Sequence, residues 1–136
     1  IAVEEVPEEE VSAYVVVSVT DLAANPTRIN HIVEKPARED APSNLAVIGR
    51  YILEPEIIDI LENTGKGSGG EIQLTDAIEE LAQQQDVYAY RFEGIRYDCG
   101  SKLGFLKANV EYALNHTELG EEFREYLKGL SCRKSL

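Results

Sequence analysis

The sequence predicts an α/β or α+β fold in which helices pack on one mixed sheet. Runs of β-branched and aliphatic residues dominate the first part of the 136-residue chain, and apolar residues at helical spacing dominate the last part. Hydrophobic residues make up 43% and charged residues 28% of the chain, which is typical of a globular protein with a buried core. We find no internal repeat or linker and therefore predict a single domain, 1–136.

Six segments have the composition of β-strands, because they are short, apolar and bounded by turn residues. Ser12–Val19 is especially rich in Val, which predicts a strand that is buried on both faces. The next strand stops at Pro36, because Pro has no N–H to continue a hydrogen-bonded ladder. In chain order the predicted strands are 1–6, 12–19, 29–36, 45–53, 87–92 and 95–100.

Four segments have the apolar spacing of amphipathic helices. Pro55 favours the first helical turn, Leu74 and Ile78 begin an i, i+4 stripe, and Thr117 is the expected N-cap of the last helix. The Gly-rich segment 65–70 lacks the order of a phosphate-binding P-loop, so we interpret it as a flexible loop. In chain order the predicted helices are 55–63, 74–82, 101–115 and 117–130.

The charge balance excludes several classes of partner. The net charge is −12, from 25 acidic and 13 basic side chains, so phosphate backbones and anionic membranes are repelled, and we expect no nucleic-acid or membrane partner. No apolar run approaches the roughly eighteen residues of a membrane-spanning helix. Cys99 and Cys132 lack CxxC spacing, which favours reduced thiols and a cytoplasmic location. The chain contains no Met and opens on "IAVEEV", so we expect it to be part of something larger.

Glu34 and Lys35 close a predicted strand and precede Pro36. Pro36 disfavours helix for Lys35, so we expect both residues to be extended and to point to opposite faces unless the strand bends there. A carboxylate suits sugar hydroxyls and an ammonium suits phosphate, and strand ends are where open α/β sheets place ligands. A charged pair at a strand end is more often only a solvated terminus, and the spacing alone leaves both interpretations open.

Asp98 precedes Cys99 and Gly100 at the end of the last predicted strand, directly before a helix. A carboxylate in this place can bind Mg²⁺, which takes one or two carboxylates together with substrate phosphates. It can equally cap the helix that begins near Ser101. Neither alternative is favoured by the residues alone.

Three segments together resemble the bacterial UTP–glucose-1-phosphate uridylyltransferase family: "VEKPAREDAPSNLAVIGRY", "GGEIQLTDAI" and "YDCGSKLGFLKANVEYAL". The resemblance extends over essentially all 136 residues and matches the C-terminal half of the family. It implies a Rossmann-like mixed-sheet nucleotidyltransferase fold, with the N-terminal nucleotide-binding half absent from this chain. It also implies Mg²⁺ as cofactor, glucose 1-phosphate and UTP or UDP-glucose as ligands, and a homo-oligomer, dimer or tetramer, formed through the last helices.

The resemblance also implies roles for individual residues. Glu34 would bind the sugar hydroxyls, Lys35 would orient the attacking phosphate, and Asp98 would hold Mg²⁺. The backbone of Ala46 and Val47 would line the glucose pocket. Tyr51 would line it too, whereas the segment Gly70–Asp76 is expected to be structural. The implied reaction is in-line attack of the sugar phosphate on UTP, with pyrophosphate as leaving group.

Two departures from the family pattern bear on this expectation. The Gly-rich nucleotide loop of the family has no counterpart in these 136 residues, so we expect the isolated chain to be inactive. Val15 stands where the family has Gly, and its side chain would intrude on a bound sugar. The alternatives are a glucose-1-phosphate thymidylyltransferase-like enzyme, which the sequence Asp98–Gly100 disfavours, and a truncated, non-catalytic oligomerisation module.

Overall fold

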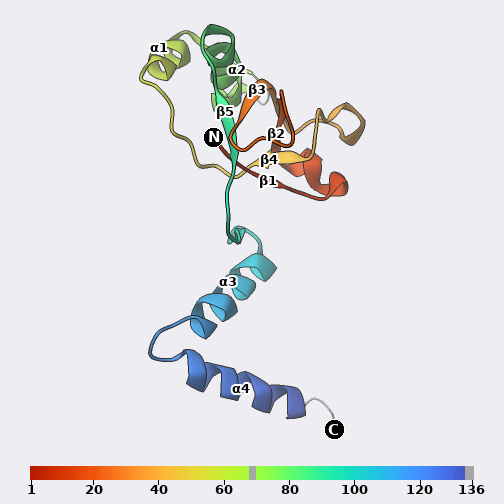
Figure 1. Cartoon of the computed structure of the whole chain (residues 1–136), viewed down its shortest axis with the longest axis vertical. Coiled ribbons are helices and arrows are strands. Elements are labelled where there is room, and N and C mark those ends of the chain that lie inside the picture. Colours follow the sequence, from red (N-terminus) through yellow and green to blue (C-terminus); the bar gives the residue numbers. More distant parts are fainter. Residues whose placement is uncertain (68–69, 134–136) are drawn as a thin grey trace. The chain divides into compact units, whose positions relative to one another are not determined.

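The computed structural model describes residues 1–67 and 70–133, with side chains described as far as residue 130. The chain divides into two compact units, Ile1–Glu93 and Gly94–Leu136. The single domain expected from the sequence stays a prediction. Each unit is described by itself (Figure 1). Residues 68 and 69 of the predicted flexible loop, and the side chain of Cys132, lie outside the described part of the chain.

The first unit is built on five short strands (Figure 1). They pair in the closed order β1–β4–β2–β3–β5. The β1–β5 pair is parallel and the other pairs are antiparallel, so the predicted mixed sheet is confirmed. The strands are β1 (Ala2–Glu5), β2 (Val15–Val19), β3 (Thr27–Glu34), β4 (Leu45–Val47) and β5 (Tyr88–Arg91).

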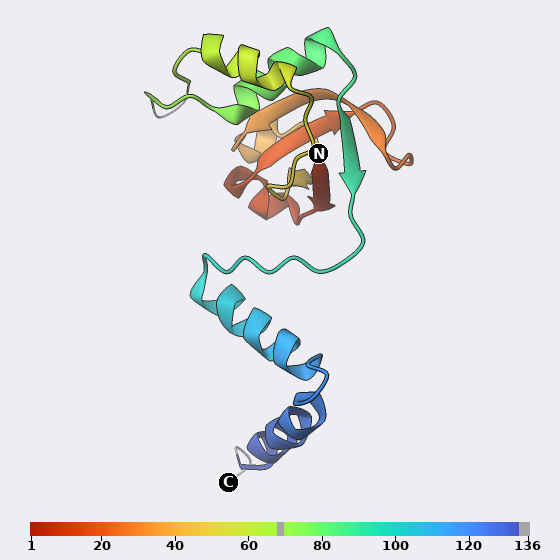
Figure 2. The same ribbon diagram turned by 90° about the vertical axis from the view of Figure 1, so that its left-hand side faces the viewer.

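Two helices cover one face of these strands, and a short 3₁₀ helix covers the other (Figure 2). The helices are α1 (Glu56–Asn63) and α2 (Leu74–Gln84), and the 3₁₀ segments are η1 (Glu8–Ala13) and η2 (Arg38–Asp40). The larger core lies between the helices and the strands, where Ile57, Ile78 and Leu81 meet the apolar residues of the sheet. A smaller core, around Val11 and Ala46, lies under η1. The predicted α/β class is therefore confirmed.

Three of the predicted strands differ clearly from the structure. β2 begins at Val15, because 12–13 belong to η1. β4 ends at Val47, and the chain turns at Gly49, which has a φ of 81°, so the apolar segment as far as Leu53 is loop rather than strand. Segment 95–100 forms no strand and leads as a turn into the next helix.

Two side-chain contacts replace backbone pairing along the strands. The carboxylate of Glu79 on α2 accepts the backbone N–H of Ile32 at 2.8 Å, and its other oxygen lies 3.0 Å from Nδ1 of His31. At the end of β5, the side-chain amide of Asn25 accepts the backbone N–H of Arg91 at 2.8 Å and donates to its carbonyl at 3.0 Å. α2 and the 20–26 loop are thereby fixed to the sheet.

The second unit contains α3 (Lys102–Leu114) and α4 (Gly120–Arg133). Ser101 is the N-cap of α3 and accepts the N–H of Gly104 at 3.0 Å. The predicted cap at Thr117 is wrong, because Nδ1 of His116 accepts the two N–H groups before α4. Among the described residues no helix is long and apolar enough to cross a membrane. Several large apolar side chains of this unit are exposed: Leu103, Phe105, Leu106, Tyr112, Leu119 and Tyr126.

Candidate functional site

Glu34 is the last residue of β3 and continues the row of side chains that faces the larger core. It stands two residues after the buried Ile32, so the alternation of the strand places both side chains on the same face. Its backbone is directly opposite Val15 of β2. A carboxylate is therefore held at the rim of an apolar core, with 23% of its side chain exposed.

Lys35 bends the chain directly after the strand. Its φ is 43°, in the left-handed region that a residue with a side chain seldom adopts, so the expectation that Lys35 is extended is wrong. The bend brings its Nζ to 3.3 Å from Oε1 of Glu34. The two side chains therefore lie on the same side of the strand end, as a shared site requires. The turn is closed by the N–H of Lys35, which donates to the carbonyl of Tyr14 at 3.0 Å.

Thr75 contacts the candidate site, although it is not among the residues predicted from the sequence. It lies in the first turn of α2, is only 7% exposed, and its Oγ1 donates a hydrogen bond of 2.9 Å to Oε2 of Glu34. The Gly70–Asp76 motif, which we expected to be only structural, thus supplies a partner to the carboxylate. The available signal was a hydroxyl residue placed one turn before Ile78, on the buried side of an amphipathic helix.

Tyr51 lies in the loop after β4 and packs against the larger core. Burial raises the pKa of its phenol, and the negative charge of Glu34 raises that pKa further. The charge of Glu34 therefore acts on the Tyr51 phenol, as a smaller cause than burial. Ala46 is fully buried and pairs with Glu4 on one side and Val16 on the other. The role of Ala46 and Val47 in lining a sugar pocket stays a prediction.

Asp98 belongs to the second unit and is exposed. Its Oδ1 accepts the N–H of Gly100 at 2.9 Å, and its carbonyl accepts the hydroxyl of Ser101 at 3.2 Å. Asp98 therefore shapes the turn, while Ser101 is the helix cap. In the part of the chain that the structure describes, no group of three or more His, Cys, Asp or Glu could hold a metal ion. The convergence of Asp98 with Glu34 stays a prediction.

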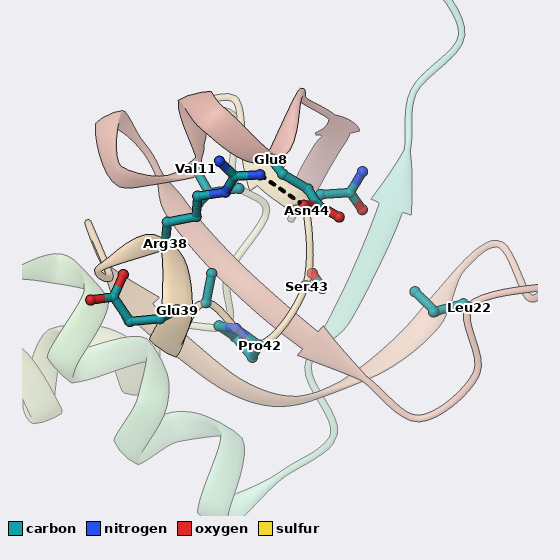
Figure 3. A pocket seen from close by; sticks show the side chains of 9 residues that line it. Glu8, Val11, Leu22, Arg38, Glu39, Pro42, Ser43 and Asn44 are labelled. Carbon is teal, nitrogen blue, oxygen red and sulfur yellow. Dashed lines mark hydrogen bonds and ion pairs between the residues drawn. The ribbon is translucent and has the colours of Figure 1, made fainter.

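Two hollows of the first unit are large enough for a small molecule. One, of about 600 Å³, is lined by residues around the Arg38–Glu8 ion pair, whose atoms are 3.2 Å apart (Figure 3). The predicted site residues do not line it. The other, of about 730 Å³, is bordered by Tyr51 together with Gly49 and Tyr90. Of the predicted residues, Tyr51 is thus the one that borders a described hollow.

The chain is similar to known nucleotidyltransferases over most of its length. UTP–glucose-1-phosphate uridylyltransferase of Staphylococcus epidermidis is 48% identical over 130 residues, which cover 96% of this chain and 45% of that protein. The Haemophilus influenzae enzyme of the same name is also 48% identical, with the same coverage. The chain thus spans less than half the length of these relatives. Its assignment to their C-terminal half stays a prediction from the motifs.

Solved structures of UDP-glucose pyrophosphorylases share the fold. A complex with UDP-glucose has a TM-score of 0.79 and 49% identity, covering 85% of this chain and 44% of that one. A UTP-bound enzyme from Acinetobacter baumannii has a TM-score of 0.82 and 46% identity, covering 93% and 44%. The nucleotidyl transferase family model matches residues 1–115. The chain therefore belongs to the nucleotidyl transferase family.

Proposed function

We propose that the chain supplies the sugar-phosphate-binding part of an enzyme that makes UDP-glucose and pyrophosphate from UTP and glucose 1-phosphate. The names of the relatives support this reaction, and so do the neighbours with UDP-glucose and UTP bound. The observation that carries the proposal is the bend at Lys35, which sets an ammonium beside the carboxylate of Glu34 at a strand end. Backbone strain of this kind is typical of functional sites.

The two charged groups suit the two ends of a hexose phosphate. Glu34 has acceptor oxygens only, so it can receive hydrogen bonds from sugar hydroxyls. Lys35, with 63% of its side chain exposed, can reach a phosphate and orient it for in-line attack on the α-phosphorus of UTP. Such transfer depends on position and charge neutralisation, which these two side chains provide for the attacking group.

We also propose that Asp98 is a ligand of Mg²⁺. An exposed carboxylate on a tight turn suits this ion, which binds proteins through one or two carboxylates and otherwise keeps water and phosphate oxygens. One protein ligand is consistent with the lack of a denser acidic cluster among the described residues. When bound, the ion supplies positive charge to the phosphates that react.

Two further proposals concern assembly and location. The exposed apolar side chains of α3 and α4 are numerous for a free surface, which supports a homo-oligomer in which these helices are covered. The exposed, free thiol of Cys99 suits the reducing cytoplasm. Sedimentation velocity of the full chain tests the first proposal: a monomer at all concentrations would contradict it.

Calorimetric titration with glucose 1-phosphate tests the proposed function. We expect saturable binding to the full chain, and a loss of affinity of at least tenfold in Glu34→Gln, because an amide nitrogen replaces one acceptor oxygen. Glu62→Gln on the exposed side of α1 is the matched control and should bind as the wild type does. Absence of binding to the wild type would overturn the proposal and favour the non-catalytic module. Val15, in the place of the family Gly, also favours that alternative.

A further inference from the structure

The two oxygens of Glu34 have partners of very different kinds. Oε2 accepts a hydrogen bond of 2.9 Å from Thr75, a residue that is 7% exposed and fixed in the first turn of α2. Oε1 lies 3.3 Å from Nζ of Lys35, whose side chain is largely exposed. One partner is thus buried and rigid, and the other lies in solvent at the end of a flexible side chain.

We propose that Thr75 is a positioning residue that fixes Oε2 of Glu34, and that Lys35 is an exchangeable partner that gives up Oε1 to a sugar hydroxyl when it moves to the phosphate. This inference rests on the proposed function, because it assigns the hydroxyl and the phosphate to the same two side chains. It adds a third residue to the site and an order of exchange between its partners.

The burial of the contacts supports the difference between the two partners. A buried hydrogen bond to a carboxylate is costly to break, since the group left behind loses its partner away from water. Thr75 also lies at the positive end of the 11-residue helix α2, which favours a negative charge in that place. An ion pair to an exposed lysine contributes little to stability, and the lysine readily leaves it for another partner.

The exchange links the two ends of the ligand. A phosphate that draws Lys35 away removes the positive group from Oε1, and this oxygen becomes available to a sugar hydroxyl. The hydroxyl end therefore binds better when the phosphate end is occupied. Glucose 1-phosphate should gain from both contacts, whereas neutral glucose must compete with Lys35 for Oε1.

Thr75→Val tests the positioning role in the full chain, because Val keeps the shape of the side chain and removes the hydroxyl. We expect an affinity for glucose 1-phosphate that is about tenfold lower, with the affinity for inorganic phosphate unchanged. Thr75→Ser keeps the hydroxyl and should retain most of the affinity. Equal loss of both affinities would mean a general structural effect and would overturn the inference.

Thr27→Val is the matched control. Thr27 is also buried, at 4% exposure, and its hydroxyl also makes one hydrogen bond, accepted from the N–H of Asp21 at 3.2 Å. It stands at the other end of β3. We expect lower stability but an unchanged affinity for glucose 1-phosphate. If Thr27→Val and Thr75→Val weaken binding equally, the positioning role is refuted.

Lys35→Met tests the exchange and does not depend on whether Thr75→Val folds. It should abolish the binding of inorganic phosphate and raise the affinity for neutral glucose severalfold, because Oε1 has lost its competing partner. An affinity for glucose that is unchanged, lower or undetectable in both proteins overturns the exchange. That result rejects only the exchange as long as the wild type binds glucose 1-phosphate and Glu34→Gln does not. A wild type that does not bind glucose 1-phosphate rejects the proposed function as well.

Discussion

Val15 and Glu34 are direct cross-strand partners in the antiparallel β2–β3 pair. Residues that stand opposite each other on neighbouring strands project from the same face of a sheet, so the Val15 side chain lies beside the carboxylate. Val15 also packs against the larger core and is half-buried. Val15, which stands where the family has Gly, is thus the immediate neighbour of Glu34, the residue proposed to bind the sugar.

We expect Val15→Gly to bind glucose 1-phosphate about fivefold or more tightly than the wild type, because removal of the side chain opens the space beside Glu34. The same change should lower the free energy of unfolding by about 2 kcal/mol, since it removes buried apolar surface and adds freedom to the unfolded chain. Calorimetry and urea unfolding measure the two effects.

The control for this prediction is Val19→Gly, at the other end of β2, where the side chain also packs partly against the larger core. It should cost similar stability and leave the affinity unchanged. A Val15→Gly protein that binds no better than the wild type would show that Val15 does not restrict access to Glu34.

The left-handed backbone of Lys35 predicts an effect on stability. Most residues pay about 1 kcal/mol for this conformation, whereas Asn adopts it more readily. Lys35→Asn should therefore be more stable than Lys35→Ala by about 0.5–1 kcal/mol in urea unfolding. Both variants lose the same charge and the same ion pair to Glu34, so the difference isolates the backbone. Equal stabilities would count against a left-handed Lys35 in solution.

The phenol of Tyr51 predicts a dependence of stability on alkaline pH. Its folded pKa is raised above the ordinary value of 10.0, first by burial and then by Glu34. Below pH 10 the phenol is neutral in both states and its contribution to stability is complete. Above that pH the unfolded chain loses the proton first, so stability falls as pH rises through the folded pKa. The stability of Tyr51→Phe should fall less steeply with pH across this range, as measured by denaturant unfolding.

The electrostatic part of this shift can be measured separately. Glu34→Gln should lower the pKa of Tyr51 but leave it above its ordinary value, because burial is the larger cause. The phenolate absorbance of each protein, minus that of its Tyr51→Phe counterpart, gives the pKa. A pKa that does not move in Glu34→Gln would place Tyr51 outside the field of the carboxylate.

Two helical glycines of the second unit give a matched pair. A Cβ at Gly104 would collide with the backbone carbonyl of Asp98, whereas a Cβ at Gly129 meets open space. Gly104→Ala should therefore disturb the turn that holds the Asp98 carboxylate and lower stability by 1 kcal/mol or more. Gly129→Ala should stabilise α4 by up to about 1 kcal/mol. Thermal unfolding followed by circular dichroism distinguishes the two variants. A stabilising Gly104→Ala would contradict the close approach of the Asp98 carbonyl to Gly104.

The elements of the first unit could largely be predicted, because their periodicity is local. The α2 stripe and the Val-rich β2 were both found in this way. The end of β4 was missed because the segment after Val47 is apolar by composition, yet the positive φ of Gly49 interrupts its regular pairing with β1. A backbone angle at one glycine is not encoded in hydrophobic periodicity.

The site was predictable only in part. The types and the order of Glu34 and Lys35 were compatible both with a ligand-binding pair and with a solvated strand end, and their roles stay a prediction from the resemblance. The bend that brings the two side chains together is a left-handed residue before a proline, against the ordinary preference. Thr75 could not be assigned, because its contact with Glu34 joins residues 41 positions apart. Such a contact depends on how α2 lies against β3, which sequence spacing does not determine.

The side-chain amide of Asn25 has one more consequence. It satisfies both the N–H and the carbonyl of Arg91, as a neighbouring strand would, at the end of β5. These are groups through which a foreign strand could add to the sheet. Asn25 therefore occupies the two backbone groups of Arg91 that would otherwise be open to intermolecular β-pairing, at the end of a strand that is paired with β1 and β3.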